Sequence, residues 1–192
     1  MSTRDKVIQA ATKLYAENGY KGMTMKAIAN EVGVKAPSLY AFYESKEDIL
    51  LHIYNDILTK HLNLATENIE ITGESVQYQL KQFLDQVIAF QLRDYTQLKV
   101  FIRLLLFPPD FFEINLKEEL KKVVEQEHKL LCNLFKVGME RGELKKADCD
   151  ALSSQLLCMM DGWFWEMQRY SEEVFRERYE MVWAQFWNSI EA

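Results

Sequence analysis

The sequence is poor in the residues that interrupt helices and in those that build disulfide frameworks. Its 192 residues include seven glycines, three prolines and three cysteines. So few glycines and prolines favour long helices over strands joined by tight turns. An odd and scattered set of cysteines favours reduced thiols. No apolar run reaches the length of a membrane span, and the first six residues lack the shape of a signal peptide. We therefore expect an all-α protein that works in the cytoplasm, without a membrane partner.

The chain also lacks the short motifs that mark common enzyme classes. It contains no HExxH, Walker loop, GxSxG or CxxC sequence, and its three histidines are scattered. We therefore expect no enzyme activity, no cofactor and no metal site. One alternative stays open. His128 lies four residues before Cys132 on the same helix face, where a charged imidazole would make a thiolate more reactive and allow redox sensing. The other interpretation is a core thiol beside a surface imidazole.

The charge is divided unevenly along the chain. The whole protein carries a formal net charge of −6. Residues 1–46 hold seven Lys or Arg and four Asp or Glu, a net charge of +3, so the remainder carries −9. A duplex would attract the first part and repel the second. This division favours a protein that presents one basic face to DNA over one that coats nucleic acid without selectivity.

Residues 24–42 have the pattern of a helix, a tight turn and a second helix. Gly33 falls where the turn needs a positive φ, and Pro37 suits the first turn of a helix. A unit of this kind mainly places its second helix in the DNA major groove, and the alternative is an ordinary helical hairpin. Five apolar residues can form the core between the two helices: Ile28, Val32, Val34, Leu39 and Phe42.

The flanking residues predict two further helices. An amphipathic helix precedes the unit and ends near Gly19. Thr24 is a good N-cap for the next helix, with Met23 and Ile28 in the positions of a hydrophobic staple. Ser45 can cap a fourth, longer helix. We therefore expect three short helices and then a long one in the first third of the chain.

Residues 18–50 resemble the N-terminal DNA-binding domain of TetR-family transcriptional regulators. Gly22 and Thr24 match the residues that open the second helix in that family. The frame that follows is matched by Ile28, Ala29, Gly33, Val34, Leu39, Tyr40, Tyr43, Lys46 and Leu50. Two positions depart from the family, since Phe42 stands where many members carry His and Lys35 where Ser or Thr is common. The operator sequence of a relative therefore cannot be used to infer the operator of this protein. Beyond residue 50 the resemblance extends only to length and helical pattern.

The resemblance implies a helix-turn-helix domain at residues 1–46 and a helical effector-binding and dimerisation domain at residues 47–192, about nine helices in all. It implies a homodimeric repressor that a small-molecule effector releases from a pseudo-palindromic operator. Ser38 can hydrogen-bond to a base edge, and Ala36 can contact a thymine methyl. The expected DNA-binding residues are Thr24, Met25, Lys26, Lys35, Ala36, Pro37, Ser38, Tyr40, Tyr43 and Lys46.

The last two predicted helices, residues 150–170 and 172–190, carry wide apolar and aromatic stripes. Stripes of this size indicate an interface with a second copy, while the alternative is that they are internal core. The expected interface residues are Leu156, Met160, Phe164, Phe175, Tyr179, Val182, Trp183, Phe186 and Trp187.

The middle helices are expected to enclose a pocket for an apolar or amphipathic effector, which could be acidic. The alternative for each apolar lining residue is that it belongs to the ordinary hydrophobic core. Arg103, a cation in an apolar run, could bind an acidic effector, pair with Asp161 or Glu166, or lie on the surface. The lining candidates are Phe83, Val87, Phe101, Arg103, Leu105, Phe107, Phe135, Met139, Met159 and Trp163. A helical binding module without useful DNA affinity is the competing function.

Overall fold

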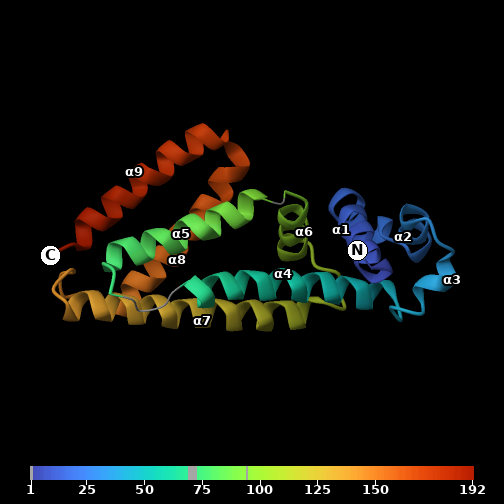
Figure 1. Cartoon of the computed structure of the whole chain (residues 1–192), viewed down its shortest axis with the longest axis horizontal. Helices are drawn as coiled ribbons and strands as arrows, with labels where there is room; N and C mark the ends of the chain where they lie inside the picture. The colour runs from blue at the N-terminus through green and yellow to red at the C-terminus, as the bar shows by residue number, and fades with distance from the viewer. Residues whose placement is uncertain (1, 69–72, 94) are drawn as a thin grey trace. The chain divides into compact units, whose positions relative to one another are not determined.

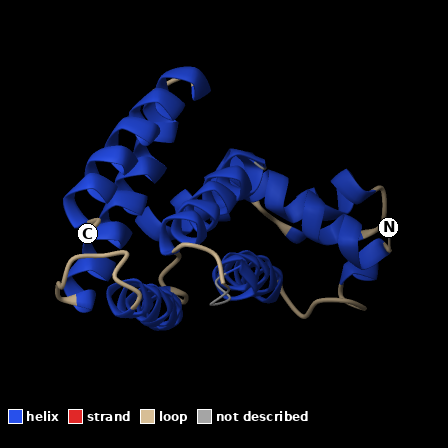
Figure 2. Ribbon diagram, turned by 60° about the vertical axis from the view of Figure 1, so that its left-hand side comes forward, coloured by secondary structure: helices blue, strands red, loops and turns tan. Residues whose placement is uncertain are grey.

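The computed structural model describes residues 2–68, 73–93 and 95–192, and these residues form nine helices with no sheet (Figures 1 and 2). This confirms the all-α prediction. The helices are α1 (Thr3–Gly22), α2 (Met25–Val32), α3 (Ala36–Leu39), α4 (Lys46–Asn68), α5 (Val76–Arg93), α6 (Tyr95–Leu106), α7 (Glu113–Glu140), α8 (Cys149–Arg169) and α9 (Glu172–Ile190). None of the helices in the described ranges is long and apolar enough to cross a membrane.

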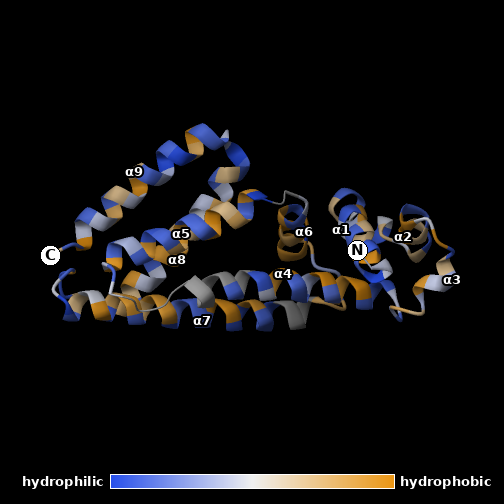
Figure 3. Cartoon of the chain, viewed as in Figure 1, coloured by the Kyte–Doolittle hydropathy of each residue, from blue (hydrophilic) through white to orange (hydrophobic). Residues whose placement is uncertain are grey.

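The helix ends follow from local sequence. Ser2 and Asp5 form a reciprocal capping box at the start of α1. Within α1, Gly19 has a φ of 66°, which breaks the helix where the sequence predicts its end. Gly142 has a φ of 73° directly after α7, again as expected of a glycine that stops a helix. Most helices carry apolar residues on one side and polar residues on the other (Figure 3).

The helices group into two compact units. The first contains residues 1–61 and 92–120, and the second contains residues 62–91 and 121–192. The helices α4, α5 and α7 therefore contribute residues to both units. These units are defined by packing alone. The boundary between the DNA-binding and effector-binding domains, after residue 46, stays a prediction.

The first unit is built around apolar residues from α1, α2, α4 and α6. Tyr54 of α4 packs edge-on against Phe112, with their ring centroids 5.1 Å apart. Burial of the Tyr54 ring raises the pKa of its hydroxyl group. The fully buried members of this core include Val7, Ala11, Ile28, Leu39, Ile49, Leu50, Val100 and Leu104.

In the second unit, aromatic residues of α8 and α9 pack against α5 and α7 of the same chain. Trp163 meets Tyr179 edge-on at 4.8 Å, and the Tyr179 hydroxyl donates to Asp85 in α5 at 2.9 Å. This burial corrects the predicted dimer interface. Seven of its nine residues are buried within one chain: Leu156, Phe164, Phe175, Tyr179, Trp183, Phe186 and Trp187. Only Met160 and Val182 keep substantial exposure.

The expectation of scattered, reduced thiols is wrong for two of the three cysteines. Cys132 of α7 and Cys149, the first residue of α8, form a disulfide. Cys158 remains a free, exposed thiol. Nothing in the sequence indicates that these two cysteines, 17 positions apart, lie close together, because their proximity depends on how the chain turns back between the end of α7 at Glu140 and the start of α8.

Candidate nucleic-acid interface

The helix-turn-helix begins with a capped α2 and a glycine turn. The Thr24 side-chain oxygen accepts the Ala27 N–H at 3.1 Å, as an N-cap does. Gly33 adopts φ 79° and ψ 30° after α2, and the Val34 N–H donates to the Ala29 carbonyl oxygen at 2.9 Å. Met23 and Ile28 are fully buried on either side of the cap, as a hydrophobic staple requires. The sequence therefore predicts α2 and the glycine turn of the helix-turn-helix correctly.

The second helix is shorter than the sequence suggests. α3 ends at Leu39, and the N–H groups of Phe42 and Tyr43 both donate to the Leu39 carbonyl oxygen. This tight turn reverses the expected orientation of two side chains. Phe42 is 44% exposed instead of packing in the core, and Tyr43 is 3% exposed instead of facing DNA. The predictions for the Phe42 and Tyr43 side chains are therefore corrected.

The remaining candidate DNA contacts gather around the turn between α2 and α3 and at the ends of these helices (Figure 1). Tyr40 is 57% exposed although it is aromatic. Exposed or half-buried positions hold Thr24, Met25, Lys26, Lys35, Ala36, Pro37, Ser38, Tyr40 and Lys46. The surface formed by these nine residues is called the α2–α3 face below. It carries three lysines, hydroxyl groups and the first backbone N–H groups of α2, all of which can bind phosphate.

Lys46, the first residue of α4, is fixed in place by α1. Its Nζ donates to the Tyr20 carbonyl oxygen at 3.2 Å and lies 3.7 Å from the centroid of the Tyr20 ring. The Tyr20 hydroxyl donates to Glu47, and this hydrogen bond is the main reason why the pKa of the Glu47 carboxyl is lowered. Ser45 accepts the Asp48 N–H at 3.2 Å, which caps α4 as predicted. The start of α4 is therefore rigidly attached to the end of α1.

Tyr43, in the segment between α3 and α4, is held by side chains of α1 and α4. Its hydroxyl accepts a hydrogen bond from Arg4 Nε at 3.1 Å, and the guanidinium lies 5.4 Å from its ring centroid. His52 of α4 meets the same ring edge-on at 5.9 Å. From the sequence, Arg4 contributes only to the basic charge of residues 1–46. Its partner is 39 residues away, and no local pattern could have identified it.

Comparison with known proteins decides the family. Residues 7–53 match the sequence model described as "Bacterial regulatory proteins, tetR family". The chain belongs to the TetR family. It is therefore a transcriptional regulator of that family, and residues 7–53 cover α1, the helix-turn-helix and the start of α4.

Two curated relatives and one solved structure extend beyond this segment. The "Fatty acid metabolism regulator protein" of Bacillus subtilis is 22% identical over 151 residues, which is 79% of this chain and 75% of the relative. The "Biofilm operon icaADBC HTH-type negative transcriptional regulator IcaR" of Staphylococcus epidermidis is 30% identical over 124 residues, 62% of each chain. The fatty acid degradation regulator FadR from Bacillus halodurans superposes with a TM-score of 0.73 at 19% identity, covering 97% of this chain and 95% of that one. At this identity the superposition shows the fold alone.

The candidate effector residues of this TetR-family chain are divided between the two units. Phe101, Arg103, Leu105 and Phe107 belong to the first unit, and the other six belong to the second. Phe107 is 76% exposed and Leu105 41% exposed, so the prediction that they line an enclosed pocket is corrected. In the second unit, Phe83, Val87, Phe135 and Trp163 are buried, and Met139 and Met159 are half-buried.

Arg103 makes contacts that the sequence did not indicate, and its role in effector binding stays a prediction. Its Nε donates to the Ala16 carbonyl oxygen at 3.1 Å, and its Nη2 donates to the Glu17 carbonyl oxygen at 3.3 Å. It therefore binds the backbone at the C-terminal end of α1. Glu166, one of the proposed acidic partners, instead accepts from Arg178 Nε at 2.5 Å.

An open groove of about 760 Å³ lies within the first unit, bordered by α1, α4 and the first turn of α6. Its lining is largely polar and includes Arg4, Asp5, Lys13, His52 and Asp56. None of the ten predicted effector residues borders it. This groove is therefore a different feature from the apolar pocket that the sequence predicts.

Proposed function

We propose that this chain is a homodimeric repressor that binds a pseudo-palindromic operator and is released by a small-molecule effector. The observation that carries the proposal is the α2–α3 face, where Lys26, Lys35, Ser38 and Tyr40 are all exposed around a correctly formed helix-turn-helix. The basic residues 1–46 of an otherwise acidic chain direct the protein to a duplex through this face. The name of the staphylococcal relative supports repression, since that protein is a negative regulator. Such a protein acts in the cytoplasm, where bacterial DNA lies.

Individual roles follow from position and chemistry. Lys35 and Ser38, at the start of α3, read base edges or adjacent phosphates, and Ala36 contacts a thymine methyl. Tyr40 binds a phosphate through its hydroxyl. At the start of α2, Thr24, Met25 and Lys26 bind a second phosphate, where the helix dipole favours an anion. Lys46 adds charge beside the same strand. Tyr43 is buried and does not contact DNA.

Dimerisation would use the outer side of α8 and α9. Val174 and Met181 are seven residues apart, so they share one face of α9, and they are 39% and 62% exposed. Val182 and Tyr170 add further exposed apolar surface, at 39% and 43%. Exposed apolar residues on α9 and at the turn that precedes it support a helical bundle shared with a second copy. Two copies would place two α3 helices about 34–36 Å apart, one turn of the duplex.

The effector would be a small apolar or amphipathic molecule, which could be acidic. The buried Phe83, Phe135 and Trp163 with the half-buried Met139 and Met159 are the lining that we propose in the second unit. Effector and DNA would each favour one of two arrangements, and each would weaken the other by the same coupling free energy. Fatty acids are the first compounds to screen, because the name of the Bacillus subtilis relative connects it with fatty acid metabolism.

The test is selection of bound fragments from the genomic DNA of the source organism. The expected result is enrichment of a few fragments that share an inverted repeat with half-sites about one duplex turn apart. These fragments then serve as probes for compounds that release the protein. Enrichment without any shared sequence would reject the operator, and an operator without two-fold symmetry would reject the dimer.

A further inference from the structure

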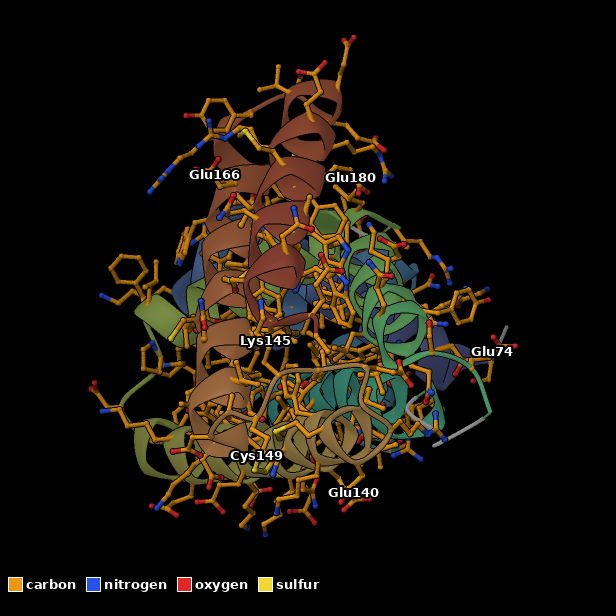
Figure 4. All side chains as sticks on the ribbon, turned by 90° about the vertical axis from the view of Figure 1, so that its left-hand side faces the viewer. Glu74, Glu140, Lys145, Cys149, Glu166 and Glu180 are labelled. Carbon is orange, nitrogen blue, oxygen red and sulfur yellow. A yellow bond between two sulfur atoms is a disulfide. The ribbon has the colours of Figure 1, made fainter. Side chains whose placement is uncertain are left out.

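The disulfide in the second unit joins two helices at a buried point. Cys132 lies in α7 and Cys149 begins α8, with their Cα atoms 4.9 Å apart. Each cysteine is only 7% exposed, whereas Cys158 is exposed and free. Figure 4 shows sulfur atoms beside the Cys149 label, where α8 starts against α7. The two cysteines are therefore positioned to form a bond with each other and not with a cysteine of a second protein chain.

We propose that Cys132 and Cys149 are a reversible thiol–disulfide pair, which a peroxide oxidises and a cellular dithiol reduces. This inference rests on the proposed function, because a DNA-bound regulator works in the compartment that holds the chromosome. In that compartment the thioredoxin and glutathione systems keep thiols reduced, and disulfides in most such proteins are transient. A disulfide between α7 and α8 would therefore form and break with the redox conditions around the protein.

Two polar groups near the disulfide, the His128 imidazole and the Asp150 carboxylate, influence its chemistry in opposite directions. His128 lies one turn before Cys132 on the same face of α7, and its Nδ1 is 3.9 Å from the Asp150 carboxylate. Its Nε2 is 3.3 Å from the Asp150 carbonyl oxygen and 3.4 Å from Ser154 Oγ. The Asp150 carboxylate and both cysteine sulfurs lie within 4.8 Å of one another. An imidazole one helical turn from Cys132 is a group that can take up a thiol proton, and the resulting thiolate is the form that attacks an oxidant. The Asp150 carboxylate disfavours the thiolate, so oxidation by peroxide should be slow.

The reaction balances with peroxide as the oxidant. One thiolate attacks a peroxide oxygen, the O–O bond breaks, and the leaving oxygen takes up a proton to give water or an alcohol. The sulfur becomes a sulfenic acid. The second cysteine thiol then attacks this sulfur, the S–S bond forms, and the sulfenic oxygen leaves as water with the thiol proton. Two electrons pass from the sulfurs to the peroxide. An external dithiol reverses the reaction and is itself oxidised to a disulfide.

The same cluster could instead bind a metal ion, because thiolate and carboxylate groups are zinc ligands. We favour the disulfide because the two sulfur atoms are bonded to each other. Zinc binding is therefore an outcome that the experiment must detect. The disulfide also constrains the start of α8, so it should stabilise the folded protein against unfolding.

The experiment treats the full-length, reduced protein with hydrogen peroxide in slight molar excess. The three free thiols of the chain should fall to one, and the mass should drop by two hydrogen atoms. A thioredoxin-type dithiol protein should restore all three without denaturant. Cys158→Ser is the matched control and should still form the bond, whereas Cys132→Ser and Cys149→Ser should not. The oxidised protein should melt on the order of 5–10 °C higher than the reduced protein.

Three results would overturn the proposal. The thiols could stay reduced in peroxide, or the disulfide could resist reduction until the protein is unfolded, as a permanent structural bond does. The reduced protein could bind one equivalent of added zinc that protects both cysteines from peroxide. Operator binding is measured on the same samples. A reversible pair in a protein that binds no operator in either redox state would reject the proposed function and leave the thiol chemistry standing.

Discussion

Arg103 of α6 donates from Nε to the backbone carbonyl oxygen of Ala16 in α1, at 3.1 Å. Its Nη2 donates to the Glu17 carbonyl oxygen at 3.3 Å. Gly19 follows directly, and a Cβ there would lie 3.2 Å from Arg103 Nη1. A cation at the C-terminal end of a helix neutralises the unpaired carbonyl groups and the negative end of the helix dipole. One side chain therefore fixes the point at which α1 bends, and α1 underlies the helix-turn-helix.

Loss of the Arg103 side chain should weaken the first unit. Arg103→Ala removes charge-assisted hydrogen bonds to two carbonyl oxygens, which should lower the free energy of unfolding by about 1.5–3 kcal/mol. Arg103→Lys keeps the charge without the planar fork and should lose less. Urea unfolding of both variants measures the difference. Equal losses in the two variants would show that the fork geometry contributes nothing.

Two glycine substitutions should have opposite effects on stability. Gly33→Ala places a Cβ in open space but at a φ of 79°, so only backbone strain acts, and we expect a loss of about 1 kcal/mol. Gly162→Ala is the matched control, since its Cβ also meets nothing within 4 Å but the residue is helical. It should stabilise the protein by about 0.5–1 kcal/mol. Thermal unfolding of both variants tests the left-handed turn, and a neutral Gly33→Ala would contradict it.

The proposed dimer should depend on Met181. Met181→Asp places a charge on a side chain that is 62% exposed in the single chain, so the fold should survive. Burial of an unpaired charge between two copies costs several kcal/mol, so the variant should sediment as a monomer. Val124→Asp on α7 is the control, because Val124 is also apolar and 49% exposed. A dimeric Met181→Asp variant would exclude this part of α9 from the interface.

The hydrogen bond between Tyr20 and Glu47 should make stability depend on acid pH. It is the main cause of the lowered pKa of the Glu47 carboxyl, whose ordinary value is 4.5. A carboxyl with a lowered folded-state pKa adds stability above its unfolded pKa, and this stability is lost as the pH falls through the folded-state pKa. Tyr20→Phe should therefore cost stability at neutral pH, and the cost should shrink as the pH falls below about 4.5. Urea titrations across this range measure it.

Tyr78→Phe is the control for this titration, because the Tyr78 side chain is 51% exposed. Its effect should be small and should not change between neutral and acid pH. A Tyr20→Phe cost that stayed constant down to the acid limit would show that the hydroxyl contributes through packing and not through the charge of Glu47.

The sequence predicts elements well wherever local chemistry decides them. Thr24, Gly33 and Gly19 each mark a helix end that the structure also has, because caps and positive φ angles depend on a few adjacent residues. The last helix, Glu172–Ile190, has the bounds that its stripe indicates. The pattern of apolar residues thus places the helices, since each needs one face to pack against another element.

The sequence fails where a partner distant in the chain decides. The aromatic stripes of α8 and α9 reveal that a face is covered, but not whether α5 and α7 or a second copy covers it. Trp183 and Phe186 would give the same sequence pattern in an interface and in a core. In the structure both are buried within one chain. Tyr43 and Phe42 exchange environments because α3 ends at Leu39, one turn earlier than the pattern indicates. Arg103 donates hydrogen bonds to backbone carbonyl groups of α1, and a pattern of side chains in the sequence cannot indicate such partners.

The central claim is that the α2–α3 face binds an operator, and the salt dependence of binding by wild type and Lys35→Ala tests it most directly. Lys129→Ala is the control, because it removes the same charge from an exposed position of α7. If Lys35 neutralises one phosphate, the slope of log K against log salt concentration should fall by about 1 in Lys35→Ala and stay unchanged in the control. Equal slopes in all three proteins, or equal affinity for operator and random DNA, would contradict the account.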